Sequence, residues 1–139
     1  MFKKILVPLD GSKLAEKILP RVEKMVRSCQ AEVHLIRAVV SYRIDPKEEK
    51  EEREQLLQEA WDYLETIVSR LRKKRVRAYA VVVYGKDAVQ ICDFARKDKV
   101  DLIAMATHGR SGISRWALGS VADKVLNCSV VPVMLIRVG

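Results

Sequence analysis

The segment from Thr107 to Ser120 has the composition of an anion-binding loop. It contains three glycines, three serines, one threonine, two arginines and one histidine, and no acidic residue. Glycines let backbone amides approach a phosphate closely, and hydroxyl groups add short hydrogen bonds. If Ser120 begins a helix, the free amides of its first turn also favour negative charge. A surface loop that merely caps a helix has a similar composition, so the residues alone leave both interpretations open.

A second group of candidate residues follows the first apolar run of the chain. Residues Ile5 to Leu9 are continuously apolar, and Asp10-Gly11-Ser12 follows them directly. Asp10 and His108 are the possible acid–base residues, but no nucleophile and base stand in a triad order. We therefore interpret Asp10 as a turn former and predict no catalytic residue. The alternative is slow hydrolysis in which Asp10 assists a metal-bound water.

Common phosphate-binding motifs are absent from the sequence. The chain has no Gly-x4-Gly-Lys-Ser/Thr, since Gly85-Lys86 is followed by Asp87 and lacks the upstream glycine. It also has no Gly-x-Gly-x-x-Gly after a predicted strand. These absences exclude the usual nucleotide loops.

Apolar runs typical of buried strands alternate along the chain with segments of helical spacing. The predicted strands are Ile5–Leu9, Val33–Val40, Arg77–Tyr84, Asp101–Ala106 and Val130–Arg137. The predicted helices follow Ser12, Asp45, Lys86 and Gly119, and Pro20 predicts an irregularity in the first of them. Asp45-Pro46-Lys47-Glu48 is a well-signalled helix start. The alternation predicts the α/β class, with an open, doubly wound parallel sheet of five strands and helices on both faces.

The position of the candidate residues follows from this architecture. Ligands of open parallel sheets bind at the carboxyl ends of the strands, where the strand order reverses. If the first and fourth strands are neighbours, Asp10 and the segment from Thr107 face each other. The length of 139 residues predicts one domain, residues 1–139.

One spacing in the sequence resembles a known motif: Gly109 is followed, after nine residues, by Gly119-Ser120. It resembles part of the Gly-x2-Gly-x9-Gly-Ser/Thr signature of the ATP-binding universal stress proteins. Residues Ile5 to Ser12 are similar to the family's opening strand and turn, and Gly85 falls where its third strand closes. Leu118 to Ala122 and Pro132-Val133 resemble its closing segment. The resemblance implies the strand order 3-2-1-4-5 and a stress-linked regulator or sensor that binds ATP or another adenine nucleotide.

The resemblance also implies which residues form the nucleotide site. Groups around adenine would come from Pro8, Leu9, Ala38 and Val39, and Asp10 would lie near the ribose or a metal, Mg or Mn, on the phosphates. The residues implied to border the ribose and phosphates are Met105, His108, Gly109 and Arg110, and those implied to hold the phosphate chain are Gly119, Ser120 and Val121.

Ala106 stands where the family signature has its first glycine. A methyl group at this position can block a ligand or forbid a positive φ. We include Ala106 among the predicted nucleotide-binding residues. The alternatives are a relative that binds no nucleotide and acts through protein interaction, and a slow metal-dependent ATP hydrolase.

The last predicted strand, Val130–Val138, is apolar and contains Pro132, which sheets tolerate mainly at their edges. Exposed apolar edges pair readily with other strands. The resemblance implies a homodimer through this strand, and we predict one.

The net charge of +8 raises the possibility of nucleic-acid binding. Residues Asp45 to Glu65 hold nine acidic and three basic residues, and a basic cluster follows between Arg70 and Arg77. Acids at the start and bases at the end of one helix complement its dipole. The cluster carries no recognition-helix or RNA-sheet signature. We therefore interpret it as a solvated helix end and predict no nucleic-acid partner.

The three cysteines, Cys29, Cys92 and Cys128, are widely spaced and form no Cys-x-x-Cys pair. We expect neither a disulfide nor a zinc site, and reduced thiols in a cytoplasmic protein. The longest apolar run has seven residues, too few to span a bilayer. We therefore predict no membrane partner.

Overall fold

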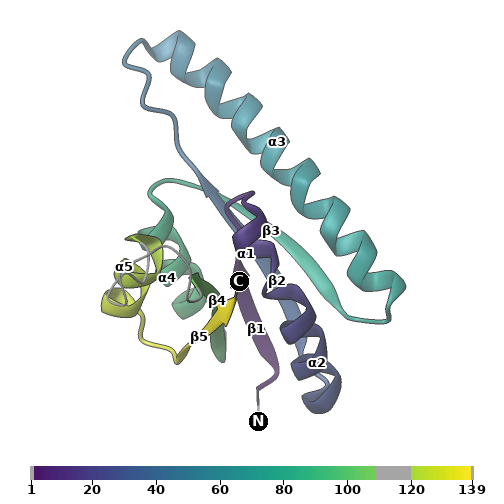
Figure 1. The fold of residues 1–139 in the computed structure, drawn as a ribbon. Coiled ribbons are helices and arrows are strands. Elements are labelled where there is room, and N and C mark those ends of the chain that lie inside the picture. Colours follow the sequence, from purple (N-terminus) through teal and green to yellow (C-terminus); the bar gives the residue numbers. More distant parts are fainter. Residues whose placement is uncertain (1, 109–119, 139) are drawn as a thin grey trace.

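The computed structural model describes residues 2–108 and 120–138, which form a parallel sheet with helices on both faces. The strands are β1 (Lys4–Pro8), β2 (Glu32–Val39), β3 (Ala78–Tyr84), β4 (Leu102–His108) and β5 (Val133–Val138). Their order is β3-β2-β1-β4-β5, and every neighbouring pair is parallel. The predicted fold class and strand order are confirmed (Figure 1). The chain order reverses between β1 and β4.

The helices are α1 (Lys13–Glu16), α2 (Leu19–Cys29), α3 (Pro46–Lys73), α4 (Asp87–Lys97) and α5 (Ser120–Cys128). The irregularity predicted at Pro20 is a break between α1 and α2, because proline lacks the amide hydrogen and its ring clashes with the preceding turn. Both predicted caps form: Ser12 Oγ accepts from the Ala15 amide at 3.1 Å, and Asp45 Oδ2 accepts from the Glu48 amide at 3.0 Å.

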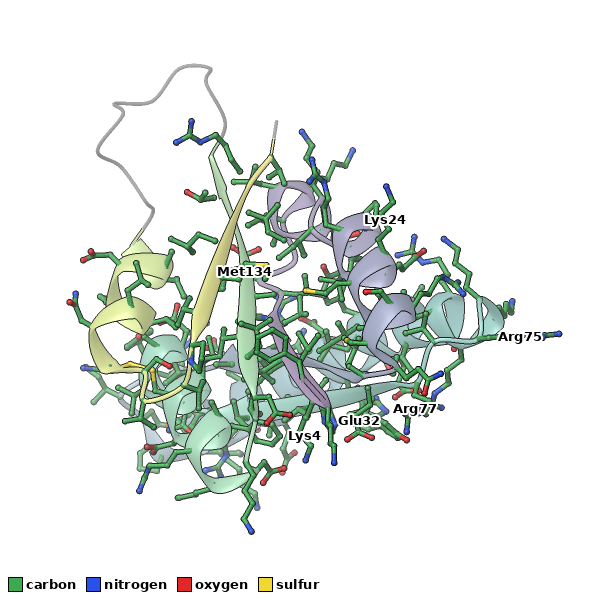
Figure 2. All side chains as sticks on the ribbon, turned by 90° about the horizontal axis from the view of Figure 1, so that it is seen from below. Lys4, Lys24, Glu32, Arg75, Arg77 and Met134 are labelled. Carbon is green, nitrogen blue, oxygen red and sulfur yellow. A yellow bond between two sulfur atoms is a disulfide. The ribbon has the colours of Figure 1, made fainter. Side chains whose placement is uncertain are left out.

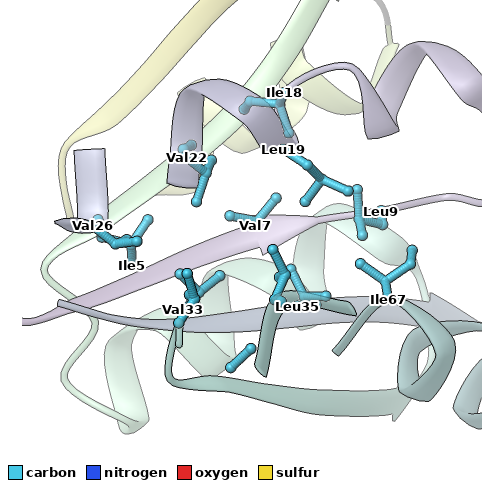
Figure 3. Packing of buried hydrophobic residues seen from close by; sticks show 14 of the residues in the cluster. Ile5, Val7, Leu9, Ile18, Leu19, Val22, Val26, Val33, Leu35 and Ile67 are labelled. Carbon is cyan, nitrogen blue, oxygen red and sulfur yellow. The ribbon is translucent and has the colours of Figure 1, made fainter. Parts of the chain in front are cut away.

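The larger hydrophobic cluster lies between the sheet and helices α2 and α3, and we call this side the α2/α3 face. Alternate residues of each strand supply it, since successive side chains point to opposite faces of a sheet. Val7 and Leu35 pack there against Ile18, Val22 and the α3 residue Ile67 (Figure 3). These buried side chains carry no polar atoms, so the centre of this face is held by apolar packing.

The opposite side of the sheet, the α4/α5 face, is covered by α4 and α5. Its buried cluster contains Leu6, Ile36 and Ile103 from the strands, and Ile91 and Val125 from the helices. Alanines at 88, 95 and 122 complete the buried helix surface. Small side chains bury less apolar area than leucine or isoleucine, so these two helices are held by less packing than α2 and α3.

A disulfide joins Cys92 of α4 to Cys128 of α5, with an S–S distance of 2.07 Å. The expectation of no disulfide is therefore wrong. The two residues are 36 positions apart in sequence, and only the packing of α4 beside α5 brings them together. Cys29, in α2, is the cysteine without a disulfide.

The last strand is shorter at its start than predicted, because β5 begins at Val133 rather than Val130. Pro132 cannot donate to the ladder, and its carbonyl instead accepts from the Ile103 amide at 2.9 Å. The fourth strand runs further than predicted, to His108 rather than Ala106, since pairing with β5 continues to that residue.

The basic residues predicted to be a solvated helix end lie near the amino ends of the strands, where Arg75 and Arg77 are labelled in Figure 2. The Arg77 guanidinium donates to the Gln30 carbonyl at 2.6 Å, and Arg72 Nε donates to the Ala78 carbonyl at 3.0 Å. Arginines that cap carbonyls have a structural role. Within the described ranges, no helix combines the length and apolarity needed to cross a membrane.

Candidate functional site

A cavity of about 360 Å³ opens at the carboxyl ends of β1 and β4, where the strand order reverses. Its position is the one at which open parallel sheets bind ligands, and its size is that of a small-molecule site. The wall comes from the ends of β1, β2 and β4, from α1, and from the first turns of α4 and α5. The lining residues are Pro8, Leu9, Asp10, Ser12, Leu14, Ala15, Ile36, Ala38, Asp87, Ile91, Met105, Ala106, Thr107, Val121 and Ala122.

The turn after β1 fixes Asp10 at the mouth of the cavity. Asp10 Oδ1 accepts from the Ser12 amide at 2.9 Å, and this hydrogen bond orients the carboxylate. Gly11 has φ +89°, and a Cβ at this position would lie 2.8 Å from Nη1 of Arg37. The turn therefore favours glycine for its backbone conformation, and a side chain here would also displace the end of the Arg37 side chain.

Arg37 and Tyr63 support this turn from the α2/α3 face. The Arg37 guanidinium carbon lies 5.1 Å from the centre of the Tyr63 ring. The Tyr63 hydroxyl donates to Glu16 Oε2 at 2.8 Å. Burial raises the pKa of Tyr63, and the hydrogen bond to Glu16 raises it further, so the phenol keeps its proton. The site turn thus rests on a network that joins β2, α1 and α3.

The described lining has an apolar floor and a polar rim. Leu9, Ile36 and Met105 form buried apolar surface, on which a flat heterocycle can pack. Helices α4 and α5 both begin at the cavity, with Asp87 and Val121 in the wall. Free amides at helix starts favour an anion there.

The charged side chains in the described part of the lining are two carboxylates, Asp10 and Asp87. Asp87 Oδ1 accepts from the Ala88 amide at 2.7 Å. No lysine or arginine of residues 2–108 and 120–138 with a described side chain reaches the wall. Nor do those ranges hold a cluster of three or more metal-ligating side chains. Two carboxylates suit a Mg²⁺ ion that a ligand phosphate also coordinates, since this ion uses few protein ligands.

Seven predicted nucleotide-binding residues line this one cavity: Pro8, Leu9, Asp10, Ala38, Met105, Ala106 and Val121. Val39 does not line it, because alternation along β2 turns its side chain to the other face of the sheet, where it is buried. His108 is the last residue of β4, and Ser120 is the first residue of α5. Gly109, Arg110 and Gly119 lie outside the described residues.

The lining residues that the sequence did not indicate as ligand contacts are Leu14, Ala15, Ile36, Asp87 and Ile91. Most are apolar and sit in regular helical or strand patterns, where they look like core. One signal was available for Asp87: it opens a helix directly after the third strand, and so falls at the carboxyl edge of the sheet.

The sequence pattern of the universal stress protein family matches residues 1–137, and the chain belongs to this family. Universal stress protein MJ0531 of Methanocaldococcus jannaschii is 32% identical over 141 residues, which cover 99% of this chain and 83% of that protein. The resemblance predicted from Gly109 and Gly119-Ser120 is thereby confirmed at the level of the family.

Solved structures agree with this assignment. The structure of MJ0577, also from Methanocaldococcus jannaschii, has a TM-score of 0.85 and 30% identity, and the match covers 100% of this chain and 98% of that one. A universal stress protein of Arabidopsis thaliana, solved with AMP bound, has a TM-score of 0.72 and 21% identity, covering 99% and 92%. At that identity the second structure supports the fold alone.

Proposed function

We propose that this protein is a single nucleotide-binding domain that binds ATP or another adenine nucleotide in the cavity between β1 and β4. The observation that carries the proposal is the cavity itself, which gathers seven of the predicted residues at the switch point of the sheet. The Arabidopsis relative, which shares this fold, was solved with AMP bound, and this makes an adenine nucleotide the first ligand to test. A change of affinity or occupancy with the cell's nucleotide pool would make the protein a stress-linked regulator or sensor.

In this proposal the apolar floor takes adenine and the helix starts take the phosphates. Pro8, Leu9 and Ala38 lie together at the ends of β1 and β2, so their backbone groups can bond the base edge. The amides at the start of α5 face the phosphate chain. Mg²⁺ or Mn²⁺, when bound, would offset the repulsion between the phosphates and the carboxylates of Asp10 and Asp87.

Ala106 fits the proposed site in its backbone conformation. It lies inside β4 and is not among the described non-glycine residues with positive φ, so the strand does not need a glycine here. Its methyl group forms part of the wall. We expect Ala106→Gly to bind nucleotide at least as tightly as the natural chain, and weaker binding would show that the methyl contributes packing to the ligand.

Identification of the natural ligand tests the proposal most directly. The protein is purified without added nucleotide and denatured, and any released ligand is identified by chromatography and mass spectrometry. Emptied protein is then titrated with AMP, ATP and MgATP by calorimetry. We expect binding of at least one of them and no turnover of ATP over hours. An empty preparation that also binds none of the three would overturn the proposal.

Two variants place the ligand in the cavity. Ala38→Leu extends a side chain into the space and should abolish binding of AMP and ATP, while the circular dichroism spectrum stays that of the natural chain. Asp10→Asn should weaken MgATP more than AMP, because it removes a carboxylate beside the phosphates. The matched control is Asp62→Asn, which changes an exposed carboxylate of α3 away from the cavity and should alter neither affinity. Equal effects of the two Asn variants would contradict the assignment.

We also propose a homodimer through the last strand. The strand order leaves β5 at one edge of the sheet, paired on one side with β4. Val133, Met134, Leu135 and Ile136 are only partly buried along this edge. An apolar edge of this kind pairs with an identical edge across a twofold axis. Light scattering at micromolar concentration should give the dimer mass, and a monomer mass would overturn this proposal.

We propose a cytoplasmic location. The proposal rests on the nucleotide that the site would bind, which is abundant there, and no longer on reduced thiols, since Cys92 and Cys128 form a disulfide. Fractionation of the source cells, followed by detection with an antibody, checks it. Recovery in a secreted or periplasmic fraction would contradict it.

A further inference from the structure

The Cys92–Cys128 disulfide connects the two helices whose first turns line the cavity. Cys92 lies in the middle of α4, and Cys128 is the last residue of α5. Asp87 and Ile91 of α4 and Val121 and Ala122 of α5 belong to the wall. The covalent bond therefore sets how α5, with its row of free amides, is held against α4.

Among the described residues, α5 contributes few side chains to the buried core. The helix has nine residues, and its buried side chains in the described part are Ala122 and Val125. Val121 is partly buried against the same cluster, and Leu126 is 40% exposed. With so small an apolar face, the cross-link at Cys128 is a large part of the attachment of α5 to the rest of the molecule.

The bond is accessible from solvent, and the site also suits the reduced pair. Cys128 is exposed and Cys92 is half-buried, so a thiol reagent can reach the Cys128 side of the bond. The Val125 carbonyl lies 3.8 Å from Cys92 Sγ, and the Ala88 carbonyl lies 3.6 Å from Cys128 Sγ. These oxygens can accept from the two thiols once the bond is broken, so neither sulfur loses a polar partner on reduction.

We propose that Cys92 and Cys128 form a reversible redox site that fixes α5 and thereby sets the affinity of the cavity for nucleotide. The inference rests on the proposed function for its ligand. The oxidised form holds the α5 amides in place and binds nucleotide more tightly. In the reduced form the end of α5 is free of α4, so binding must also order the helix.

The redox steps balance with ordinary cellular reagents. In reduction, a dithiol attacks Cys128 Sγ, the S–S bond breaks, and the second thiol displaces Cys128 as the dithiol closes to a disulfide. Two electrons and two protons pass to the cysteines. In oxidation, a thiolate of the pair attacks hydrogen peroxide to give a sulfenic acid and hydroxide. The other thiol then displaces water from the sulfenic acid to form the S–S bond.

The test uses the full chain carrying Cys29→Ser, so that the pair provides the only thiols. Peroxide-oxidised and dithiothreitol-reduced samples are compared by thiol titration, by intact mass and by calorimetry with AMP. We expect no free thiol in the first sample and two thiols in the second, and about fivefold weaker AMP binding after reduction. Re-oxidation should restore the affinity.

A double variant, Cys92→Ser with Cys128→Ser, provides the matched control. It should bind AMP as the reduced protein does, and dithiothreitol should not change its affinity. The AMP affinity of the protein with and without the Cys92–Cys128 disulfide tests whether this bond influences the cavity. Equal AMP affinity of the oxidised and reduced samples, or failure of peroxide to remove the two thiols, would overturn the proposal.

Hydrogen exchange at the α5 amides separates this proposal from the nucleotide proposal. We expect faster exchange in α5 after reduction, with exchange in α2 unchanged. If AMP and ATP bind to neither form, the nucleotide proposal fails together with the affinity claim, while the exchange result still shows whether the bond fixes α5. Unchanged exchange in α5 would overturn the redox proposal by itself.

Discussion

The two faces of the sheet differ in how they hold their helices. Among the described residues, eighteen that are buried form the cluster on the α2/α3 face, and ten form the cluster on the α4/α5 face. Helices α2 and α3 bury mainly leucine, isoleucine and valine, whereas α4 and α5 bury three alanines, Ile91 and Val125. The face with less apolar packing carries the disulfide and supplies Ile36, Ile91, Met105 and Ala122 to the cavity wall, to which the α2/α3 cluster contributes Leu9.

This difference separates stability from binding within one small sheet. Close-packed apolar side chains leave no room for a ligand, so a binding site requires a region that side chains do not fill. Here that region is the end of the α4/α5 face near the carboxyl ends of the strands. A covalent bond between α4 and α5 offsets part of the lost packing.

Two substitutions at neighbouring positions test whether the two faces contribute separately to stability and to binding. Leu35 and Ile36 are both fully buried, and they point to the α2/α3 face and the α4/α5 face respectively. Leu35→Ala should cost about 4 kcal/mol in the free energy of unfolding. Ile36→Ala should also destabilise the chain and should in addition change nucleotide affinity, because Ile36 lines the cavity.

Urea unfolding measures the stability of both variants, and calorimetry with AMP measures their affinity. The folded fraction of Leu35→Ala should bind AMP as the natural chain does. An affinity change in Leu35→Ala as large as that in Ile36→Ala would show that the two faces are not separate.

Loss of the disulfide is the second largest expected effect. The bond closes a loop of 36 residues, and its reduction should lower the free energy of unfolding by about 3 kcal/mol. Thermal unfolding with and without dithiothreitol measures this loss. Cys29→Ser is the control and should show the same dithiothreitol effect as the natural chain. A reduced protein as stable as the oxidised one would mean that packing alone holds α5.

A smaller loss is expected at the start of α3. Asp45→Ala removes the side-chain acceptor for the Glu48 amide and should cost about 1 kcal/mol. Because this cap lies outside both clusters, nucleotide affinity should not change. Asp45→Asn keeps an acceptor and should recover most of the stability in urea unfolding. An Asn variant as unstable as the Ala variant would show that the acceptor is not what matters.

The smallest expected effect is a pH dependence at the amino edge of the sheet. Asp101 Oδ2 accepts from the Lys3 and Lys4 amides at 2.8 Å each, and these hydrogen bonds lower the pKa of Asp101. A carboxylate whose pKa is lower in the folded state stabilises the fold fully above its unfolded pKa. That stabilisation is lost as the pH falls from about 4 through the folded pKa.

Urea unfolding of the natural chain and of Asp101→Asn at pH 7 and pH 3 measures this contribution. The difference in stability between the two proteins should be below about 1 kcal/mol at pH 7 and should shrink at pH 3. A difference that grows on acidification would reverse the sign and contradict the assignment.

Much of the fold could be predicted because its signals are local. Apolar runs mark the buried strands, and residues such as Ser12 and Asp45 mark helix starts by their own hydrogen bonds. Pro20 and Pro132 act through missing amide hydrogens. The sequence correctly predicts a helix irregularity at Pro20, but the strand it predicts from Val130 includes Pro132, which lies just before β5. This error also has a local cause, because the apolar run begins at Val130, before the first residue that pairs with β4.

The site was predictable only in part, because a cavity is defined by residues from distant segments. Asp10 and Ala38 were indicated by the family resemblance and do lie in the wall. Ile36 and Ile91 look like ordinary core residues in the sequence, and only the tertiary structure shows that they line the cavity. Val39 shows the reverse case, since alternation along β2 turns it away from the cavity.

The sequence by itself determined the elements, their parallel arrangement and the family, since periodicity, caps and motif spacing are properties of neighbouring residues. The tertiary structure alone decided which helix ends meet the strand ends and which face is thinly packed. It also paired Cys92 with Cys128 across 36 residues. Such long-range contacts depend on how helices pack on a sheet, and the spacing of residues along the chain does not encode that packing in any short pattern.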